Sequence, residues 1–262
     1  MRNLNFAKTT TMQRYIFLDL DDTLFQTLRK CPDASDPRLQ ARAMLTDGTA
    51  NSYATHKQQW LWDWFAQDFK IVPVTGRDAG EFARVQLPFA EEAVIIHGAV
   101  ILDKQGQADP QWMAQMQAEL PDYQQKLLAV WQTIDTPALR DQGYNPRLVN
   151  EFDVTWYGVI KHSEGKEEAL RIVLDKLIKH HPHLQDGSLY WHLNGNNLAV
   201  LPAIVNKERA VQHLLQRYRQ QHPELFTFAA GDSHTDAPFM ALCDYALIPK
   251  NTQLHQRLVA RQ

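Results

Sequence analysis

The chain alternates short apolar runs with longer segments in which apolar residues recur every three or four positions. The short runs are nearly continuous rather than alternating, and each ends at polar residues, glycine or proline. This pattern predicts strands of a sheet that is covered on both faces. The runs lie at 15–18, 71–74, 93–96, 225–230 and 245–248.

Two segments near these runs predict amphipathic helices. Residues 56–69 and 206–221 each carry an apolar stripe with a period close to 3.6. Strands that alternate with helices predict a doubly wound, Rossmann-like α/β core with a parallel sheet. In such a core, ligands bind at the carboxyl ends of the strands.

The middle of the chain has a different pattern. It predicts two helices and three strand-like segments, with Asn194-Gly195-Asn196-Asn197 as the turn of a hairpin. The helices are expected at 111–133 and 165–181, and the strand-like segments at 148–161, 189–193 and 198–201. We therefore predict an inserted α+β domain over 107–202, within a core formed by 1–106 and 203–262.

Two segments of the predicted core show no firm periodicity. Residues 1–13 are expected to be a loose tail, with Met12 as an alternative natural start. Residues 28–55 are expected to be a long loop, in which Asp47-Gly48 can form a short hairpin.

An acidic segment, Asp19-Leu20-Asp21-Asp22-Thr23, directly follows the first predicted strand. Side chains two apart in extended backbone share a face, so Asp19 and Asp21 are expected to lie together and repel each other. A divalent cation such as Mg²⁺ relieves that repulsion. An acidic turn without function is the alternative.

Three further polar motifs follow in chain order. They are Thr75-Gly76-Arg77, Lys207 and Gly231-Asp232-Ser233-x-x-Asp236. Taken singly, each also fits a structural role: a turn, a surface lysine beside the N-cap Asn206, or a helix cap. Together with Asp19-x-Asp21-x-Thr23, these motifs resemble the haloacid-dehalogenase (HAD) superfamily of phosphohydrolases. The segment from His97 to Asp103 and the insertion after it resemble the Cof-type and sucrose-phosphatase-like branch, which has a large α/β cap.

The resemblance implies a role for each motif. Asp19 would attack phosphorus and form an aspartyl-phosphate, while Asp21 would act as the general acid and base. Thr75 and Gly76 would hold phosphate oxygens, and Lys207 would face the same anion. Mg²⁺ would be bound at a site formed by Asp19, Asp21, Asp232 and Asp236, the last acting indirectly or by orienting Lys207. Asp22, His97 and Thr235 depart from the usual family pattern.

Other candidate residues have two interpretations. Arg77 can bind the substrate or form a surface salt bridge, and His97 can bind the substrate or serve a structural role. Trp60, Trp62 and Trp64 suggest carbohydrate stacking, but the helical spacing of Trp60 and Trp64 predicts that these two are core residues.

Composition narrows the class of protein. The 262 residues are 44% hydrophobic and 22% charged, with a net charge of −3 and no polybasic run, so no nucleic-acid partner is expected. No apolar run approaches the roughly 20 residues of a membrane span, and two distant cysteines indicate neither a disulfide framework nor a zinc site. We expect a soluble, cytoplasmic protein.

The leading hypothesis is a Mg²⁺-dependent phosphatase that acts on a small phosphorylated metabolite such as a sugar phosphate. A phosphomutase on the same scaffold and a non-catalytic, receiver-like phosphate-binding module are the alternatives. The insertion of roughly a hundred residues argues against a compact receiver module. Nothing in the sequence indicates an oligomeric state.

Overall fold

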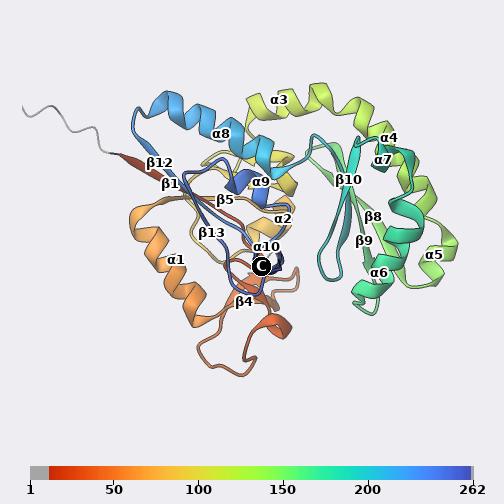
Figure 1. Cartoon of the computed structure of the whole chain (residues 1–262), viewed down its shortest axis with the longest axis horizontal. Helices are drawn as coiled ribbons and strands as arrows, with labels where there is room; N and C mark the ends of the chain where they lie inside the picture. The colour runs from red at the N-terminus through yellow and green to blue at the C-terminus, as the bar shows by residue number, and fades with distance from the viewer. Residues whose placement is uncertain (1–11, 261–262) are drawn as a thin grey trace, which may run out of the picture. The chain divides into compact units, whose positions relative to one another are not determined.

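The computed structural model describes residues 12–260, and Figure 1 shows the order of the elements. The chain divides into two compact units, one of Met1–Gln107 with Lys207–Gln262 and one of Ala108–Asn206. Residues 1–11 of the predicted tail lie outside the described residues. Gln13, which that prediction also included, is already the first residue of strand β1.

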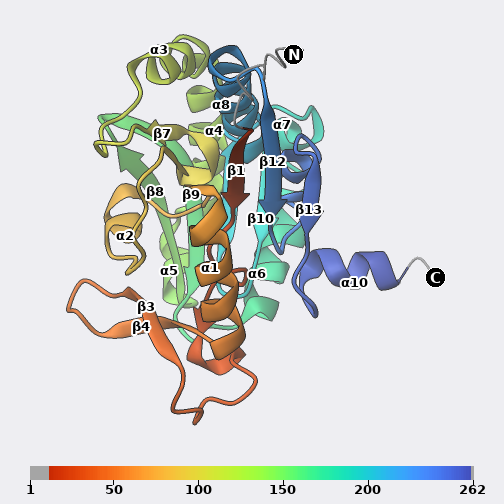
Figure 2. The ribbon, with the colours of Figure 1, turned by 90° about the vertical axis from the view of Figure 1, so that its left-hand side faces the viewer.

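A parallel sheet forms the centre of the first unit. Its order is β13 (Tyr245–Leu247), β12 (Leu225–Ala230), β1 (Gln13–Leu18) and β5 (Lys70–Pro73). Figure 2 shows β1, β12 and β13 side by side. Leu18 pairs with Ala230 on one side and Pro73 on the other, so the residues after these strands emerge at one edge of the sheet.

Helices cover both faces of this sheet, as the doubly wound pattern predicts. The ring of Tyr218, on α8 (Lys207–Gln221), stacks on Tyr15 of β1 with centroids 4.2 Å apart. The alternate residue Ile16 belongs instead to a buried cluster that contains Phe65 of α1 (His56–Asp68). The two helices therefore lie on opposite sides of the strands (Figure 1).

The predicted strand at 93–96 is present and meets the parallel sheet through a short parallel bridge. β6 (Ala93–Ile95) pairs antiparallel with β7 (Val100–Leu102). The bridge joins Val94 to Val74, and the N–H of Thr75 donates to the carbonyl of Val94 at 2.8 Å. Shorter helices complete the unit: η1 (Leu28–Lys30), α2 (Ala79–Ala83), η2 (Ile96–Gly98), α9 (Ala237–Met240) and α10 (Gln253–Val259).

The segment predicted as a long loop contains regular structure. β2 (Gln26–Thr27), β4 (Ala50–Ala54) and β3 (Gln40–Met44) form a small antiparallel sheet. The hairpin at Asp47-Gly48 is present, with Gly48 at a φ of 82° that favours glycine. The sheet as a whole escaped prediction because β3 contains no β-branched or aromatic residue and its pairing with β4 contains register shifts.

The second unit contains an antiparallel sheet of four strands. Its order is β10 (Leu189–Leu193), β11 (Leu198–Pro202), β9 (Val154–His162) and β8 (Tyr144–Glu151). The predicted hairpin through Asn194–Asn197 therefore joins β10 to β11. The strand-like segment at 148–161 is a second hairpin that turns at Phe152 and Asp153.

The helices of this unit are more broken than the periodicity predicts. The segment at 111–133 contains two helices, α3 (Pro110–Glu119) and α4 (Pro121–Ile134), because Pro121 has no N–H to continue the first. The segment at 165–181 consists of α6 (Glu167–Val173) followed by a π-helical turn, η3 (Leu174–Ile178). Two short helices, α5 (Pro137–Asp141) and α7 (Pro182–Gln185), complete the unit.

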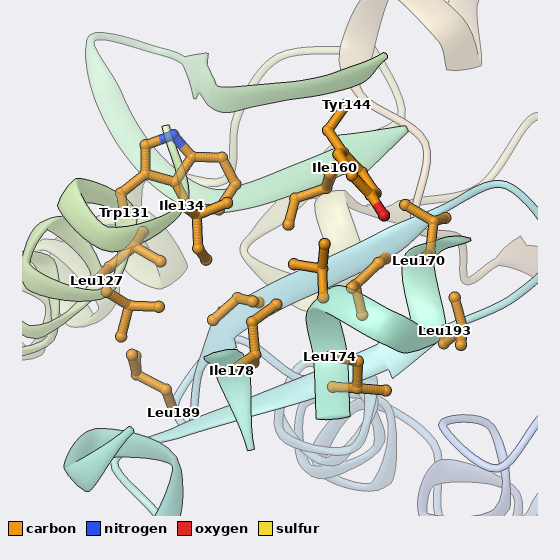
Figure 3. Close-up of a cluster of buried hydrophobic side chains, with 14 residues drawn as sticks. Leu127, Trp131, Ile134, Tyr144, Ile160, Leu170, Leu174, Ile178, Leu189 and Leu193 are labelled. Atoms are coloured by element: carbon orange, nitrogen blue, oxygen red, sulfur yellow. The ribbon is translucent and has the colours of Figure 1, made fainter. Parts of the chain in front are cut away.

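A buried apolar cluster holds the second unit together, and Figure 3 shows its side chains converging between helices and sheet. Trp131 of α4 lies directly over Gly158 of β9, where an added Cβ would approach the indole to 2.1 Å. The sheet therefore needs glycine at this position to accept the largest side chain of the cluster.

Candidate active site

Asp19 is the first residue after β1, and the sheet fixes its position. Its backbone N–H donates to the carbonyl of Ala230 at 2.9 Å, next to the end of β12. Its side chain is buried, and its Oδ2 accepts a hydrogen bond of 3.1 Å from the hydroxyl of Thr23. This leaves the carboxylate at the carboxyl end of the parallel sheet, as predicted from the strand pattern.

Lys207 joins two carboxylates that come from distant parts of the chain. Its buried ammonium donates to Oδ1 of Asp19 and to Oδ1 of Asp236, both at 2.7 Å. The α-helix α8 begins at Lys207, as the sequence predicts. An ammonium has three N–H donors, so these two contacts leave one for a further acceptor.

The loop after β12 folds around the side chain of Asp236. Its Oδ2 accepts from the backbone N–H groups of Asp232 and Ser233, at 3.1 and 2.8 Å, and from the Ser233 hydroxyl at 2.7 Å. A Cβ on Gly231 would lie 2.5 Å from that of Asp236, so only glycine permits this approach. Asp236 is thereby fixed as a partner of Lys207.

The site contains more buried negative charge than the ammonium of Lys207 can neutralise. Burial raises the pKa of Asp19 to about 7 despite its contact with Lys207, and Asp236 adds to the rise. Burial and the neighbouring Asp19 and Asp236 raise the pKa of Asp232 to about 9. Asp236 behaves differently, because Lys207 and the hydrogen bonds from Ser233 outweigh its burial and lower its pKa. The ammonium of Lys207 therefore does not neutralise all three carboxylates.

This donor set fits a hard divalent cation. Asp19, Asp232 and Asp236 each have a carboxylate oxygen within 4.8 Å of the others, and all three side chains are buried. Oxygen ligands and excess negative charge are what Mg²⁺ selects. The carboxylate of Asp21, which the sequence also suggested as a ligand, lies outside this group of three.

Arg77 holds the carboxylate of Asp21 through two hydrogen bonds. Its Nε donates to Oδ2 and its Nη2 to Oδ1, both at 2.8 Å. The guanidinium also lies over the ring of Phe25, 5.2 Å from its centroid. Arg77 is largely buried and Asp21 half-exposed, so this is an anchored salt bridge rather than a flexible surface pair.

The Thr75-Gly76 segment lies at the same sheet edge as Asp19. The N–H of Val74 donates to the carbonyl of Leu18 at 2.7 Å, and the buried hydroxyl of Thr75 accepts from the N–H of Arg77 at 3.2 Å. His97 packs against this turn, because a Cβ on Gly76 would lie 2.4 Å from its imidazole.

Sequence reasoning missed several supporting side chains. Thr23 and Ser233 bind the carboxylates of Asp19 and Asp236, and Lys30 forms an ion pair with Asp22. Thr23 and Ser233 lie inside the motifs described above, so their positions could have indicated that they belong to the site. Lys30 lies in the segment expected to be a loop, and no sequence pattern indicated its contact with Asp22.

Comparison with known proteins identifies the family. The sequence model of the sucrose-6F-phosphate phosphohydrolase family matches residues 12–258. The chain belongs to this family. Membership confirms the resemblance to the sucrose-phosphatase-like branch and places the chain among the HAD-superfamily phosphatases.

A curated relative is also named as a phosphatase. A glucosyl-3-phosphoglycerate/mannosyl-3-phosphoglycerate phosphatase of Methanococcoides burtonii is 30% identical over 105 residues, which are 40% of this chain. The chain spans only 36% of that curated relative.

Solved structures show the same fold at low sequence identity. The sucrose-phosphatase of Synechocystis sp. PCC6803 has a TM-score of 0.52 at 15% identity, over 95% of this chain and 97% of that one. The C-terminal domain of trehalose-6-phosphate phosphatase from C. albicans has a TM-score of 0.52 at 17% identity, over 87% of this chain and 73% of that one. Among the described residues, no helix has both the length and the apolar character needed to cross a membrane.

Proposed function

We propose that the protein is a Mg²⁺-dependent phosphatase that hydrolyses a small sugar phosphate through an aspartyl-phosphate on Asp19. The observation that supports this most strongly is the buried ammonium of Lys207, which donates to both Asp19 and Asp236 at the carboxyl end of the sheet. Burying a cation between two carboxylates has a desolvation cost, so the arrangement is weak evidence for stability. A functional role would explain why the site retains it. Phosphoryl transfer is such a role, because it needs both a nucleophile and compensation of negative charge.

The first step uses Asp19 as the nucleophile. An oxygen of its carboxylate forms a bond to phosphorus, the bond between phosphorus and the sugar oxygen breaks, and Asp21 gives that oxygen a proton. Lys207 and Thr23 hold the Asp19 carboxylate in place. Fixing the nucleophile in this way reduces the entropic part of the barrier.

The second step regenerates the enzyme. Asp21, now ionised, takes a proton from water as the water oxygen attacks phosphorus, and the bond to Asp19 breaks to release inorganic phosphate. One carboxyl group can serve both steps because its role reverses once it has lost its proton.

The remaining residues of the site are proposed to bind the phosphate and the metal ion. Thr75, Gly76 and the third N–H of Lys207 are proposed to receive the phosphate oxygens. Asp19 and Asp232, with Asp236 beside them, would hold Mg²⁺. When bound, Mg²⁺ supplies the positive charge that allows a carboxylate to approach a phosphate dianion.

The substrate class rests on the family and on the relatives. The family and the similar proteins are named for sucrose, trehalose or glycosyl-phosphoglycerate phosphates. We propose that the second unit is a cap that shields the reaction from water and selects the leaving group. Its boundaries follow the division at Ala108 and Asn206.

The test is release of inorganic phosphate from a panel of mono- and disaccharide phosphates, with Mg²⁺ or with EDTA. We expect turnover that requires Mg²⁺ and disappears in Asp19→Asn, which keeps the size of the side chain but removes the nucleophile. Equal turnover by Asp19→Asn would exclude the proposed role of Asp19. Transfer of the phosphate to a second sugar position, without release, would instead support a mutase.

A further inference from the structure

The outer face of α1 carries two exposed tryptophans. Trp60 is 64% exposed and Trp64 is 43% exposed, and their rings stack with centroids 6.2 Å apart. This reverses the prediction from helical spacing, since the neighbouring Trp62 is the buried one, at 7% exposed. Large aromatic side chains at adjacent surface positions characterise association surfaces, where tryptophan is enriched among the residues that contribute most.

The charges along this face oppose the helix dipole. Lys57 is in the first turn, which contains no acidic residue, and Asp68 is the last residue of the helix, whose final turn contains no basic residue. The macrodipole favours acidic residues at the N-terminus of a helix and basic residues at its C-terminus. An antiparallel copy of the same helix would compensate for the unfavourable charges, because its acidic end would lie beside the basic end of the first helix.

We propose that the exposed face of α1, formed by Lys57, Trp60, Trp64 and Asp68, is a homodimer contact in which two α1 helices pack antiparallel across a two-fold axis. The axis passes between Trp60 and Trp64, so Trp60 of one protomer lies against the partner's Trp64. A two-fold contact is self-complementary, and these residues share one face at i, i+3 or i+4 spacing. Lys57 then lies near the partner's Asp68.

Asp68 is able to accept this second cation. Its Oδ1 receives a 3.0 Å hydrogen bond from Nη1 of Arg14, and both side chains are half-exposed. A carboxylate has about four acceptor sites, so a lysine can approach without displacing Arg14. Such an exposed contact contributes orientation and specificity more than affinity.

The exposed aromatic face is limited to the helix. Trp64 stacks at 5.0 Å on Phe65, which is fully buried, so this ring contact leads into the core. A face of two tryptophans and their neighbours is small beside the roughly 800 Å² per partner of a standard interface. We therefore expect a reversible dimer with a dissociation constant in the micromolar range.

Sedimentation velocity from low to several hundred micromolar protein tests this proposal. The wild type should shift from monomer to dimer, and Trp60→Gln with Trp64→Gln should weaken the dimer by about tenfold or more. Trp191→Gln, which removes a 39% exposed tryptophan from the second unit, is the matched control and should have no effect. A wild type that stays monomeric throughout, or a dimer unaffected by the double substitution, overturns the proposal.

Charge reversal tests the antiparallel geometry itself. Lys57→Glu and Asp68→Lys should each weaken the homodimer, because each places like charges together at both ends. An equimolar mixture of the two variants should associate again, since both ends then pair opposite charges. Failure of the mixture to recover overturns the geometry. The phosphatase reaction should be the same in all of these variants, so this result does not depend on the proposed function.

Discussion

The turn at His97 shows how individual residues shape the Thr75-Gly76 edge of the candidate site. Ile96 and His97 have φ values of 52° and 54°, in the left-handed region that a β-branched residue such as Ile96 rarely adopts. The N–H of His97 donates to the carbonyl of Thr75 at 3.0 Å. Strain of this kind persists only when the surroundings impose it, and it is concentrated at functional sites. Here it places the imidazole against Gly76.

Gly76→Ala should therefore be destabilising. The new methyl would lie 2.4 Å from a buried imidazole that its backbone holds in place. Overpacking of this kind costs about 1–3 kcal/mol in the free energy of unfolding, measurable by urea denaturation. Gly80→Ala in α2 is the matched control, because its nearest contact would be an ordinary 3.4 Å from the end of Arg84. If the two variants were equally stable, the packing of His97 would not constrain Gly76.

Arg77 forms a salt bridge, which was one of the two interpretations of the sequence, but its side chain is largely buried and its partner is Asp21. It holds Asp21, the proposed acid and base, and is itself fixed by Phe25 and by the carbonyl of Glu81 at 3.4 Å. Spacing within the chain could not indicate this pairing, because the two residues are 56 positions apart. We regard Arg77 as a positioning residue for Asp21.

Arg77→Gln should lower kcat by an amount that depends on the leaving group of the substrate. Alkyl phosphates such as sugar phosphates need a proton from Asp21, so their turnover should fall by about 100-fold or more. p-Nitrophenyl phosphate has a leaving group that needs little protonation and should be affected far less. Comparison of kcat for the two substrate types checks this. A uniform loss would instead indicate that Arg77 contacts the phosphate.

At the scale of elements, helix α1 shows both the strength and the limit of sequence patterns. Its bounds, His56–Asp68, are close to the predicted 56–69 because Thr55 and Gln58 form a capping box. Part of its buried face was predicted wrongly, because Trp60 and Trp64 are exposed and Trp62 is buried. Apolar residues lie on more than one side of the helix, and spacing alone could not decide which tryptophans face the core.

Thr55→Ala should shorten or weaken α1 from its N-terminus. The Thr55 hydroxyl accepts the N–H of Gln58 at 3.3 Å, and the Gln58 side chain accepts the N–H of Thr55 at 2.9 Å. Loss of an N-cap side chain typically costs about 1 kcal/mol, which chemical denaturation can measure. Thr55→Ser retains the hydroxyl and should keep most of that stability. Equal losses in both variants would show that the cap is not the cause.

At the scale of the whole molecule, the sequence predicted the core sheet and the meeting of distant motifs. Lys207 donates to Asp19 across 188 positions of sequence, and the ends of parallel strands made that meeting predictable. Apart from the hairpin turn at Asp47-Gly48, the sheet within 26–54 was not predicted, and neither was the break at Pro121. Short strands with register shifts leave no clear period. The proline lies within a long apolar stripe that favoured one continuous helix.

The buried carboxylates should make the stability of the whole protein depend on pH and Mg²⁺. The pKa values of Asp19 and Asp232 rise to about 7 and about 9 on folding, from an unfolded value near 4. With EDTA, their contribution is fully present below about pH 4 and is lost progressively as the pH rises from there to about 9. The melting temperature should therefore fall over this range.

Mg²⁺ should reverse the fall, because it binds the folded state and stabilises the ionised carboxylates. The rise in melting temperature on adding Mg²⁺ should be larger at pH 8 than at pH 5, and Asp232→Asn should reduce it. A Mg²⁺ effect that is the same at both pH values would contradict a site made of these carboxylates.

Detection of the phosphoryl group on Asp19 during turnover would test its proposed role as nucleophile. Acid quenching in the presence of Mg²⁺ and a substrate that is turned over, followed by peptide mass spectrometry, should locate the label on the peptide that contains Asp19. The label should be absent with EDTA and in Asp19→Asn. Rapid turnover with the phosphoryl group on another residue, or full activity in Asp19→Asn, would exclude Asp19 as the nucleophile.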